Sequence, residues 1–208
     1  MSLKFLKPVL LSMLISFVAL ANASDPDILT DFVIPPNTNT SAINGQFFTY
    51  CSLRGIFDAD IPTTFKATKA SMAEFPALNG QSVSFAVLQF PAGSSNPPHT
   101  HPRASELLLV VKGSLEVGLV DTTNKLYTQT LQLGDMFVFP KGLVHYQYNA
   151  DPKEQAQVIS AFGSASAGTV SVPMSLFTTG IDDGVLAIAF KTDVATIQKI
   201  KAGLAPKA

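Results

Sequence analysis

The strongest constraint on the fold of this chain is a series of short, apolar segments between residues 83 and 162. They are rich in Val, Phe, Leu and Tyr, and clusters of Gly, Pro, Asn or Asp separate them. None of them sustains a 3.6-residue period, so the pattern predicts an all-β domain, either a closed barrel or a sandwich of two sheets. The expected strands are residues 83–90, 106–112, 115–120, 126–133, 136–139, 146–149 and 155–162.

Different patterns flank this β region. Residues 25–44 are rich in Pro, Asn, Asp and Thr, which predicts an extended or looped N-terminal arm. After Pro173 the pattern becomes helical, with a short helix expected at 182–190 and a longer one that Asp193 can cap. The apolar residues of the longer helix recur every three or four positions, at Val194, Ile197, Ile200 and Leu204. This helical tail, about residues 173–205, has little core of its own, so we expect it to pack on another subunit or across the barrel.

Composition excludes several classes of protein. The chain is 47% hydrophobic and 14% charged, which indicates a folded domain rather than a disordered one. Its 14 basic and 15 acidic residues leave a net charge of -1, which provides no basic surface for nucleic acid. Its single cysteine, Cys51, excludes both an intrachain disulfide and a thiolate zinc cluster. Cys51 is either buried or paired with another chain, and we expect it to be buried.

The first 23 residues have the pattern of a secretory signal peptide. Lys4 and Lys7 precede an apolar run at 9–20, and Ala21-Asn22-Ala23 has the small-x-small form of a cleavage site. The run is shorter than the roughly 20 apolar residues that span a bilayer. We therefore expect cleavage after Ala23, a secreted mature chain with no membrane attachment, and a single domain at 24–208 with its barrel at about 55–170.

Secretion would make Asn39 a glycosylation acceptor. Asn39 begins the triplet Asn39-Thr40-Ser41, whose middle residue is not proline. Many such triplets stay unmodified, but an acceptor has to lie on the surface. We therefore expect Asn39 in a surface loop.

The three histidines of the chain are candidates for one metal site. They are His99, His101 and His145. Alternate side chains of a strand share a face, so His99 and His101 can both point into the barrel. Glu106 follows Pro102, which interrupts the strand and can turn the carboxylate inward as well. Three imidazoles and one carboxylate suit manganese, iron, zinc, copper or nickel, so these residues leave the identity of the metal open.

Two spaced motifs frame these candidates. The first contains Gly93, five residues, His99-Thr100-His101, four residues, Glu106, six residues and Gly113. The second contains Gly134, five residues, Pro140-Lys141-Gly142, two residues, His145, three residues and Asn149. Both resemble the motifs of the cupin superfamily, and in particular of the plant germins and germin-like proteins. The resemblance extends to the signal peptide, the Asp25-Pro26-Asp27 mature start and the helical tail.

This resemblance implies a fold, a cofactor and an assembly. The fold is an all-β cupin (jelly-roll) barrel that holds one Mn²⁺ ion through His99, His101, Glu106 and His145. The assembly is a secreted hexamer, a trimer of dimers with interlocking helical tails. Four protein ligands in an octahedral shell leave two positions for water or a small anionic or oxygen-species substrate, which is typical of a reactive site. Asn96 is the candidate for a hydrogen-bond donor beside these positions.

The sequence departs from the family pattern at two places. Germins usually carry two cysteines near the mature start that form a disulfide; Cys51 matches the second, but Val33 stands at the first. Oxalate-oxidising germins place two asparagines over the open metal positions; Asn96 matches one, and Ala86 stands at the other. The missing amide removes a donor that oxalate would need, so oxalate oxidation is not expected.

Three function classes follow from these features. The first is superoxide dismutation in a secreted protein with a role in the cell wall, stress or defence. The second is a non-enzymatic extracellular receptor, wall or nutrient-reservoir protein that keeps the metal barrel for stability. The third is cleavage of nucleotide sugars by a pyrophosphatase or phosphodiesterase reaction. That reaction needs cationic clamps on phosphate, and we expect the nearby Arg103 and Lys141 to lie on the surface.

Overall fold

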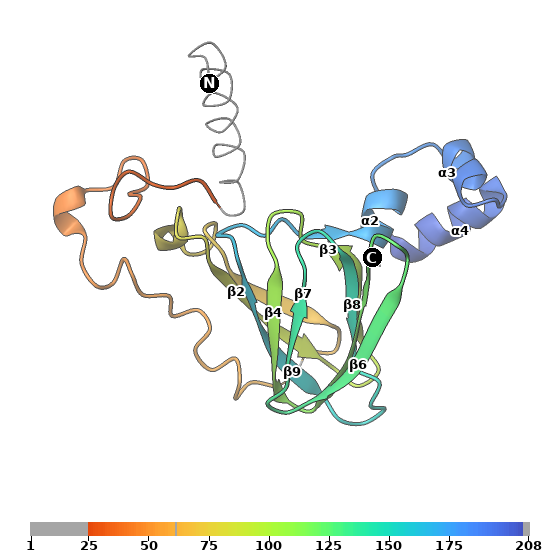
Figure 1. Ribbon diagram of the computed structural model, residues 1–208, viewed down its shortest axis with the longest axis horizontal. Coiled ribbons are helices and arrows are strands. Elements are labelled where there is room, and N and C mark those ends of the chain that lie inside the picture. Colours follow the sequence, from red (N-terminus) through yellow and green to blue (C-terminus); the bar gives the residue numbers. More distant parts are fainter. Residues whose placement is uncertain (1–24, 61, 206–208) are drawn as a thin grey trace, which may run out of the picture.

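Two antiparallel sheets of five strands each form the body of the molecule (Figure 1). The computed structural model describes residues 25–60 and 62–205, so the predicted signal peptide lies outside the described residues. The first sheet has the order β1 (Lys66–Ala70), β2 (Ser84–Phe90), β9 (Ala156–Phe162), β4 (Glu106–Lys112), β7 (Met136–Phe139). The second has the order β10 (Val170–Ser171), β3 (Ser95–Thr100), β8 (Val144–Tyr148), β5 (Ser114–Val120), β6 (Leu126–Gln132).

The hydrophobic core lies between the two sheets, and strand alternation decides which side chains enter it. In β4, Glu106, Leu108 and Val110 are buried, whereas Leu107 between them is exposed. The inward orientation of Glu106 therefore follows from the same parity that buries its apolar neighbours. The core side chains are Leu88, Phe90, Leu108, Val110, Leu115, Val117, Leu131, Phe139 and Val158, among others.

The predicted all-β barrel with a helical tail is confirmed, and each of the seven expected segments coincides with a strand to within two residues. Three strands were missed. Strand β3 contains Pro97 and Pro98, which hide the usual strand signal. Strand β1 carries two lysines at the edge of its sheet, and β10 has only two residues.

The tail contains three helices, of which sequence reasoning had predicted two. Asp182 caps α3 by accepting hydrogen bonds from the backbone N–H groups of Gly184 and Val185. Asp193 caps α4 in the same way, as predicted. Helix α2 was missed because its six residues are too few to show a period. The helices are α2 (Val172–Phe177), α3 (Asp183–Ala189) and α4 (Val194–Leu204).

Helices α3 and α4 stand away from the barrel (Figure 1). They pack on each other around a small apolar cluster formed by Leu186, Ala187 and Ile197, with Phe177 and Ile181 beside it. Within the chain, helix α2 of the tail contacts strands β3 and β10 of the barrel. The expectation that the rest of the tail packs on another subunit stays a prediction. No helix in the described ranges is long and apolar enough to cross a membrane.

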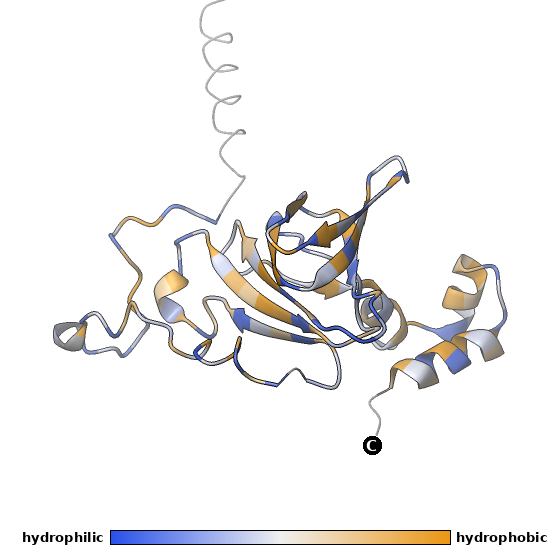
Figure 2. Ribbon diagram, turned by 90° about the horizontal axis from the view of Figure 1, so that it is seen from below, coloured by the Kyte–Doolittle hydropathy of each residue, from blue (hydrophilic) through white to orange (hydrophobic). Residues whose placement is uncertain are grey.

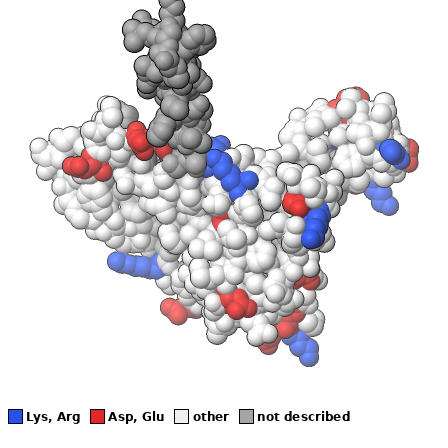
Figure 3. All heavy atoms as spheres, in the orientation of Figure 1, with Lys and Arg blue, Asp and Glu red and all other residues white. Residues whose placement is uncertain are grey.

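The N-terminal arm runs irregularly along the other side of the barrel (Figure 1), as expected. Its one helical turn, η1 (Thr40–Ala42), is capped by the exposed Asn39. A second such turn, η2 (Pro76–Leu78), follows β1. Cys51 is only half-buried, not buried as expected, because it lies in the irregular segment between this arm and β1 and not in the core. Charged side chains are scattered over the face shown in Figure 3 and form no basic patch there.

Candidate metal centre

The four predicted ligands meet inside the barrel. The ligand atoms of His99, His101, Glu106 and His145 lie within 4.8 Å of one another, and all four residues are buried. Metal–ligand bonds of about 2.0–2.2 Å place opposite ligands about 4.4 Å apart, so this spacing suits a single ion. The donor set of three imidazoles and one carboxylate, as found in the sequence, is therefore assembled in space.

Both sheets contribute to the cluster. His99 and His145 face each other as register partners on β3 and β8 of the second sheet, whereas Glu106 begins β4 of the first. His101 lies one residue beyond the end of β3, where the chain crosses between the sheets. Its carbonyl accepts a 3.1 Å hydrogen bond from the backbone N–H of Gly142, which ties the first motif to the second.

The outer nitrogens of the three imidazoles are all engaged. His99 Nδ1 lies 2.8 Å from the Pro97 carbonyl, and His145 Nδ1 lies 2.8 Å from the Leu143 carbonyl. His101 Nδ1 contacts Thr169 Oγ1 at 3.3 Å. A carbonyl can only accept, so His99 and His145 carry a proton on Nδ1. Their Nε2 atoms, when the rings are neutral, hold lone pairs toward the centre of the cluster.

This arrangement brings hydrogen-bond acceptors together. Glu106 Oε2 lies 3.0 Å from His101 Nε2 and 3.2 Å from His145 Nε2. A carboxylate oxygen facing imidazole lone pairs is unfavourable unless a proton or a metal ion lies between them. The residues present therefore fit a bound cation, on donor chemistry as well as on spacing.

Burial controls the charge of these groups. Burial, together with the neighbouring His145, lowers the pKa of His99 to about 4, so that this ring is neutral near pH 7. Burial alone would raise the pKa of Glu106, but its contacts with the His101 and His145 imidazoles and the hydrogen bond from Ser160 outweigh burial and lower the pKa to about 2. The site thus presents an ionised carboxylate beside a neutral imidazole, which is the form that binds a metal.

A second group of buried polar residues holds the cluster, and sequence reasoning missed most of it. Ser160, which lies on β9, donates a 2.6 Å hydrogen bond from its Oγ to Glu106 Oε1. Gln147 Nε2 lies 3.5 Å from the same oxygen, and Gln147 Oε1 accepts a 2.8 Å hydrogen bond from Asn96 Nδ2. Asn96 Nδ2 also lies 3.4 Å from His99 Nε2, so the predicted donor stands directly beside the cluster. The only sequence signal for Gln147 is its parity with His145, two residues before it.

Other positions of the two motifs stabilise loops and turns and do not contribute to the metal cluster. The amide of the buried Asn149 donates to the carbonyls of Phe90, Pro91 and Glu154, at 3.2, 3.1 and 2.8 Å, and so ties three segments together. Gly93, Gly113, Gly134 and Gly142 all have positive φ angles. The motifs therefore combine ligands with residues that shape the turns around them.

The two expected surface cations are indeed exposed. Arg103 donates to the carbonyl and hydroxyl of Ser166, at 2.6 and 3.0 Å, and so holds the loop that follows β9. Lys141 lies in the exposed turn before β8. A third cation, Lys69 on β1, was not predicted because it lies far from both motifs in the sequence. It lines a cavity beside the cluster.

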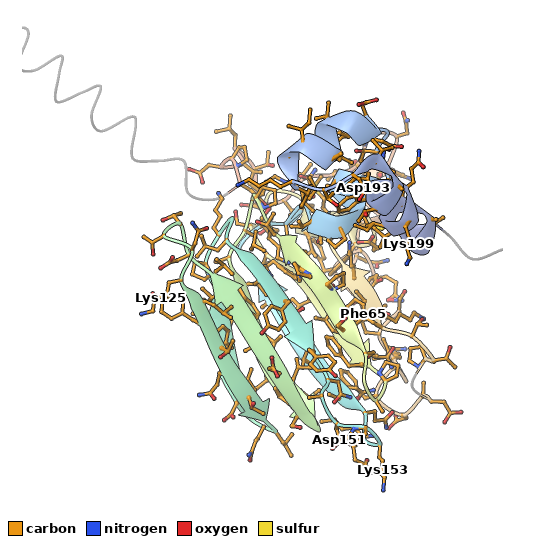
Figure 4. All side chains as sticks on the ribbon, turned by 90° about the vertical axis from the view of Figure 1, so that its right-hand side faces the viewer. Phe65, Lys125, Asp151, Lys153, Asp193 and Lys199 are labelled. Atoms are coloured by element: carbon orange, nitrogen blue, oxygen red, sulfur yellow. The ribbon has the colours of Figure 1, made fainter. Side chains whose placement is uncertain are left out.

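A cavity of about 280 Å³ opens beside the cluster. His99, His101 and Glu106 form its polar end together with Asn96 and Thr169, and Ala86 lies in its wall. Figure 4 shows Phe65, another lining residue, on the side of the barrel, between the helical tail and the end that carries Asp151 and Lys153. The cluster is therefore accessible to a small molecule from one side.

The hydrogen bond from Ser160 gives a first prediction. In Ser160→Ala, Glu106 loses its closest donor, so a metal held by this carboxylate should bind about tenfold more weakly, as is typical when a group that orients a ligand is removed. Ser84→Ala is the matched control, because Ser84 is equally buried but donates to the Ser164 carbonyl instead. Competition with a chelator measures the affinity. Equal affinities in the two variants would show that Ser160 does not orient the ligand.

Comparison with known proteins identifies a family and several relatives of this chain. Residues 58–198 match the Cupin family. Germin-like protein 9-3 of Oryza sativa subsp. japonica is 59% identical over 203 residues, which cover 95% of this chain and 94% of that protein. The rhicadhesin receptor of Pisum sativum is 46% identical over 142 residues, covering 67% of this chain and 65% of the receptor.

Solved structures with a similar fold support this relationship. A structure of oxalate oxidase superimposes with a TM-score of 0.78 at 32% sequence identity, covering 89% of this chain and all of that one. The Cupin match spans more than half of the chain, and the rice relative is similar over almost its whole length. On this evidence the chain belongs to the germin-like proteins of the cupin superfamily.

Proposed function

We propose that this is a secreted, manganese-binding germin-like protein that dismutates superoxide in the extracellular space. The observation that carries the proposal is the buried cluster of three imidazoles and one carboxylate at the end of an accessible cavity. A manganese ion held there would supply one-electron chemistry by alternating between two oxidation states. Manganese is the weakest binder in the general affinity series, so its choice rests on the family and not on the donor set.

The residues of the chain would contribute positioning and selectivity. The carbonyls of Pro97 and Leu143 fix the rings of His99 and His145 by accepting their Nδ1 protons. Phe139 stacks on His145 at 4.3 Å, and Phe162 lies edge-on against His101 at 4.8 Å between ring centroids. These rings limit water around the ligands, and the Asn96 amide provides a donor for a small anion at the edge of the cluster.

The decisive test is activity of the reconstituted protein. Purified protein loaded with manganese should dismutate superoxide faster than the same concentration of free manganese, and it should not oxidise oxalate. The second expectation follows because Ala86 places a methyl group, and no amide donor, in the cavity wall. Activity no higher than that of free manganese would refute the proposed reaction.

A non-enzymatic role is the second candidate, and the similarity to the rhicadhesin receptor favours it. In that case the metal cluster would serve stability, and an extracellular surface would carry the function. A variant that loses dismutation but keeps its biological effect would support this alternative. Nucleotide-sugar cleavage is not proposed, because among the described residues Lys69 is the only cation that lines the cavity. Arg103 is engaged with Ser166, and Lys141 lies in an exposed turn.

We further propose that the protein assembles as a hexamer, a trimer of dimers. Two separate apolar surfaces support this, since two kinds of contact are needed for such an assembly. One is the outer face of the first sheet, where Phe85, Leu107, Met136 and Val138 are exposed; Figure 2 shows that strands of the barrel are rich in hydrophobic residues, without distinguishing their two faces. The other is the tail, with Val185, Ile188, Phe190 and Val194 exposed. Light scattering should give six times the mass of the mature chain, and the mass of one chain would refute the assembly.

A further inference from the structure

The cavity beside the cluster is larger and less polar than superoxide requires. Its volume of about 280 Å³ is close to the lower limit for sites that bind small organic molecules, roughly 300 Å³. Superoxide has only two atoms. Apart from the polar end at the cluster, the walls are formed largely by apolar side chains, including Phe65, Ala67, Ala86, Leu88 and Phe162.

The register of the first sheet shows how this apolar wall is built. Ala86 of β2 lies between two cross-strand partners, Lys69 on β1 and Ser160 on β9. Partners in a sheet project to the same face, so all three point toward the cavity side of the sheet. Ser160 contacts Glu106, and neighbouring strands lie about 4.8 Å apart. A molecule along this row would therefore extend over Ala86, with one end near the cluster and the other near Lys69.

Lys69 gives the rim of the cavity a positive charge. It is exposed, lines the cavity and forms no ion pair with any of the residues that the structure describes. Glu74 is near enough to interact with it electrostatically, but the Glu74 carboxylate is hydrogen-bonded to the backbone and hydroxyl of Ser71. The ammonium group therefore remains free to meet an anionic group at the rim.

From this geometry we infer that the cavity binds a small organic monocarboxylate with an apolar body, such as an aromatic ring. The apolar part lies against Ala86 and Leu88, and Lys69 attracts the negative charge. This inference rests on the proposed site beside the metal cluster, but it does not depend on dismutation. A compact dicarboxylate, by contrast, has no apolar part that could pack against Ala86 and Leu88.

Benzoate is a suitable probe, because two small molecules separate its features. Acetate has the carboxylate without the ring, and benzyl alcohol has the ring without the charge. Titration calorimetry on the metal-loaded protein at low salt should show benzoate binding at least about tenfold more tightly than acetate, because the ring buries apolar surface. Acetate binding as tightly as benzoate, or no saturable benzoate binding, would overturn the inference.

The charge is tested by a pair of lysine variants. Lys69→Gln should weaken benzoate binding about threefold without changing benzyl alcohol binding, and the difference should disappear at high salt, as for other exposed charge pairs. Lys66→Gln is the matched control, since Lys66 lies on the same strand but does not line the cavity. An equal loss of benzoate affinity in the two variants would show that the charge of Lys69 has no specific role in binding.

Dismutation is scored separately on the same preparation. A protein that dismutates superoxide but binds no benzoate refutes this inference and leaves the proposed function standing. A protein that binds benzoate as described but shows no dismutation supports the inference and refutes the proposed reaction.

Discussion

Glu106→Gln is expected to reduce the metal affinity of the protein by at least about 100-fold. Removal of a group that merely orients a ligand typically costs 10- to 100-fold, and here the ligand itself loses its charge. Glu106 is the only anionic member of the cluster, and its low pKa keeps it ionised. The neutral amide would leave three imidazole lone pairs facing a cation without charge compensation. Bound metal per chain after dialysis, and competition with a chelator, measure the loss.

Glu154→Gln is the matched control for this experiment. It removes the same charge from an exposed loop, so its metal content should equal that of the wild type. Thermal unfolding provides a second readout: metal at 100 times its dissociation constant should stabilise the wild type by about 2.7 kcal/mol, which corresponds to roughly 5–10 °C. Glu106→Gln should show no comparable shift at that concentration. Equal metal binding by the two variants would show that Glu106 is not a ligand.

Gly113→Ala is expected to destabilise the fold by about 3 kcal/mol, or roughly 6–12 °C in melting temperature. Gly113 ends the first motif with a φ of +73°, a conformation that costs an alanine about 1–2 kcal/mol. In addition, an added Cβ would lie 2.4 Å from the backbone carbonyl oxygen of Gln155. Backbone cannot rotate away as a side chain can, so the clash adds a further cost.

Gly142→Ala separates the two contributions. Gly142 has a similar φ of +79°, but an added Cβ would have no heavy atom within 4 Å. It should therefore lose only about 1 kcal/mol, or roughly 2–4 °C. Thermal and urea unfolding of the two metal-free variants, run in parallel, measure the stability that each substitution costs. Equal losses would show that the contact with Gln155 is relieved by a local shift and that only backbone conformation matters.

Gly113 and Gly142 look alike in the sequence but differ in their surroundings in the structure. Both occupy motif positions, and both lie in the Gly- or Pro-containing clusters that separate the predicted strands. Only the structure shows that Gly113 also packs against the segment before β9, more than forty residues later in the chain. The same is true of Asn149, whose motif position gave no sign that its amide ties three loop segments together.

The sequence by itself determined seven of the ten strands that the structure describes, the two longer helices and the four cluster residues, because alternation, helical periodicity and ligand spacing are local patterns. Tertiary structure decided that Glu106 reaches the histidines from the opposite sheet, that Ser160 holds its carboxylate, and that Lys69 and Ala86 share a cavity wall. These relations depend on which strands pair and in what register. Strand pairing brings together residues that are far apart in the chain, and local sequence periodicity does not indicate which strands pair.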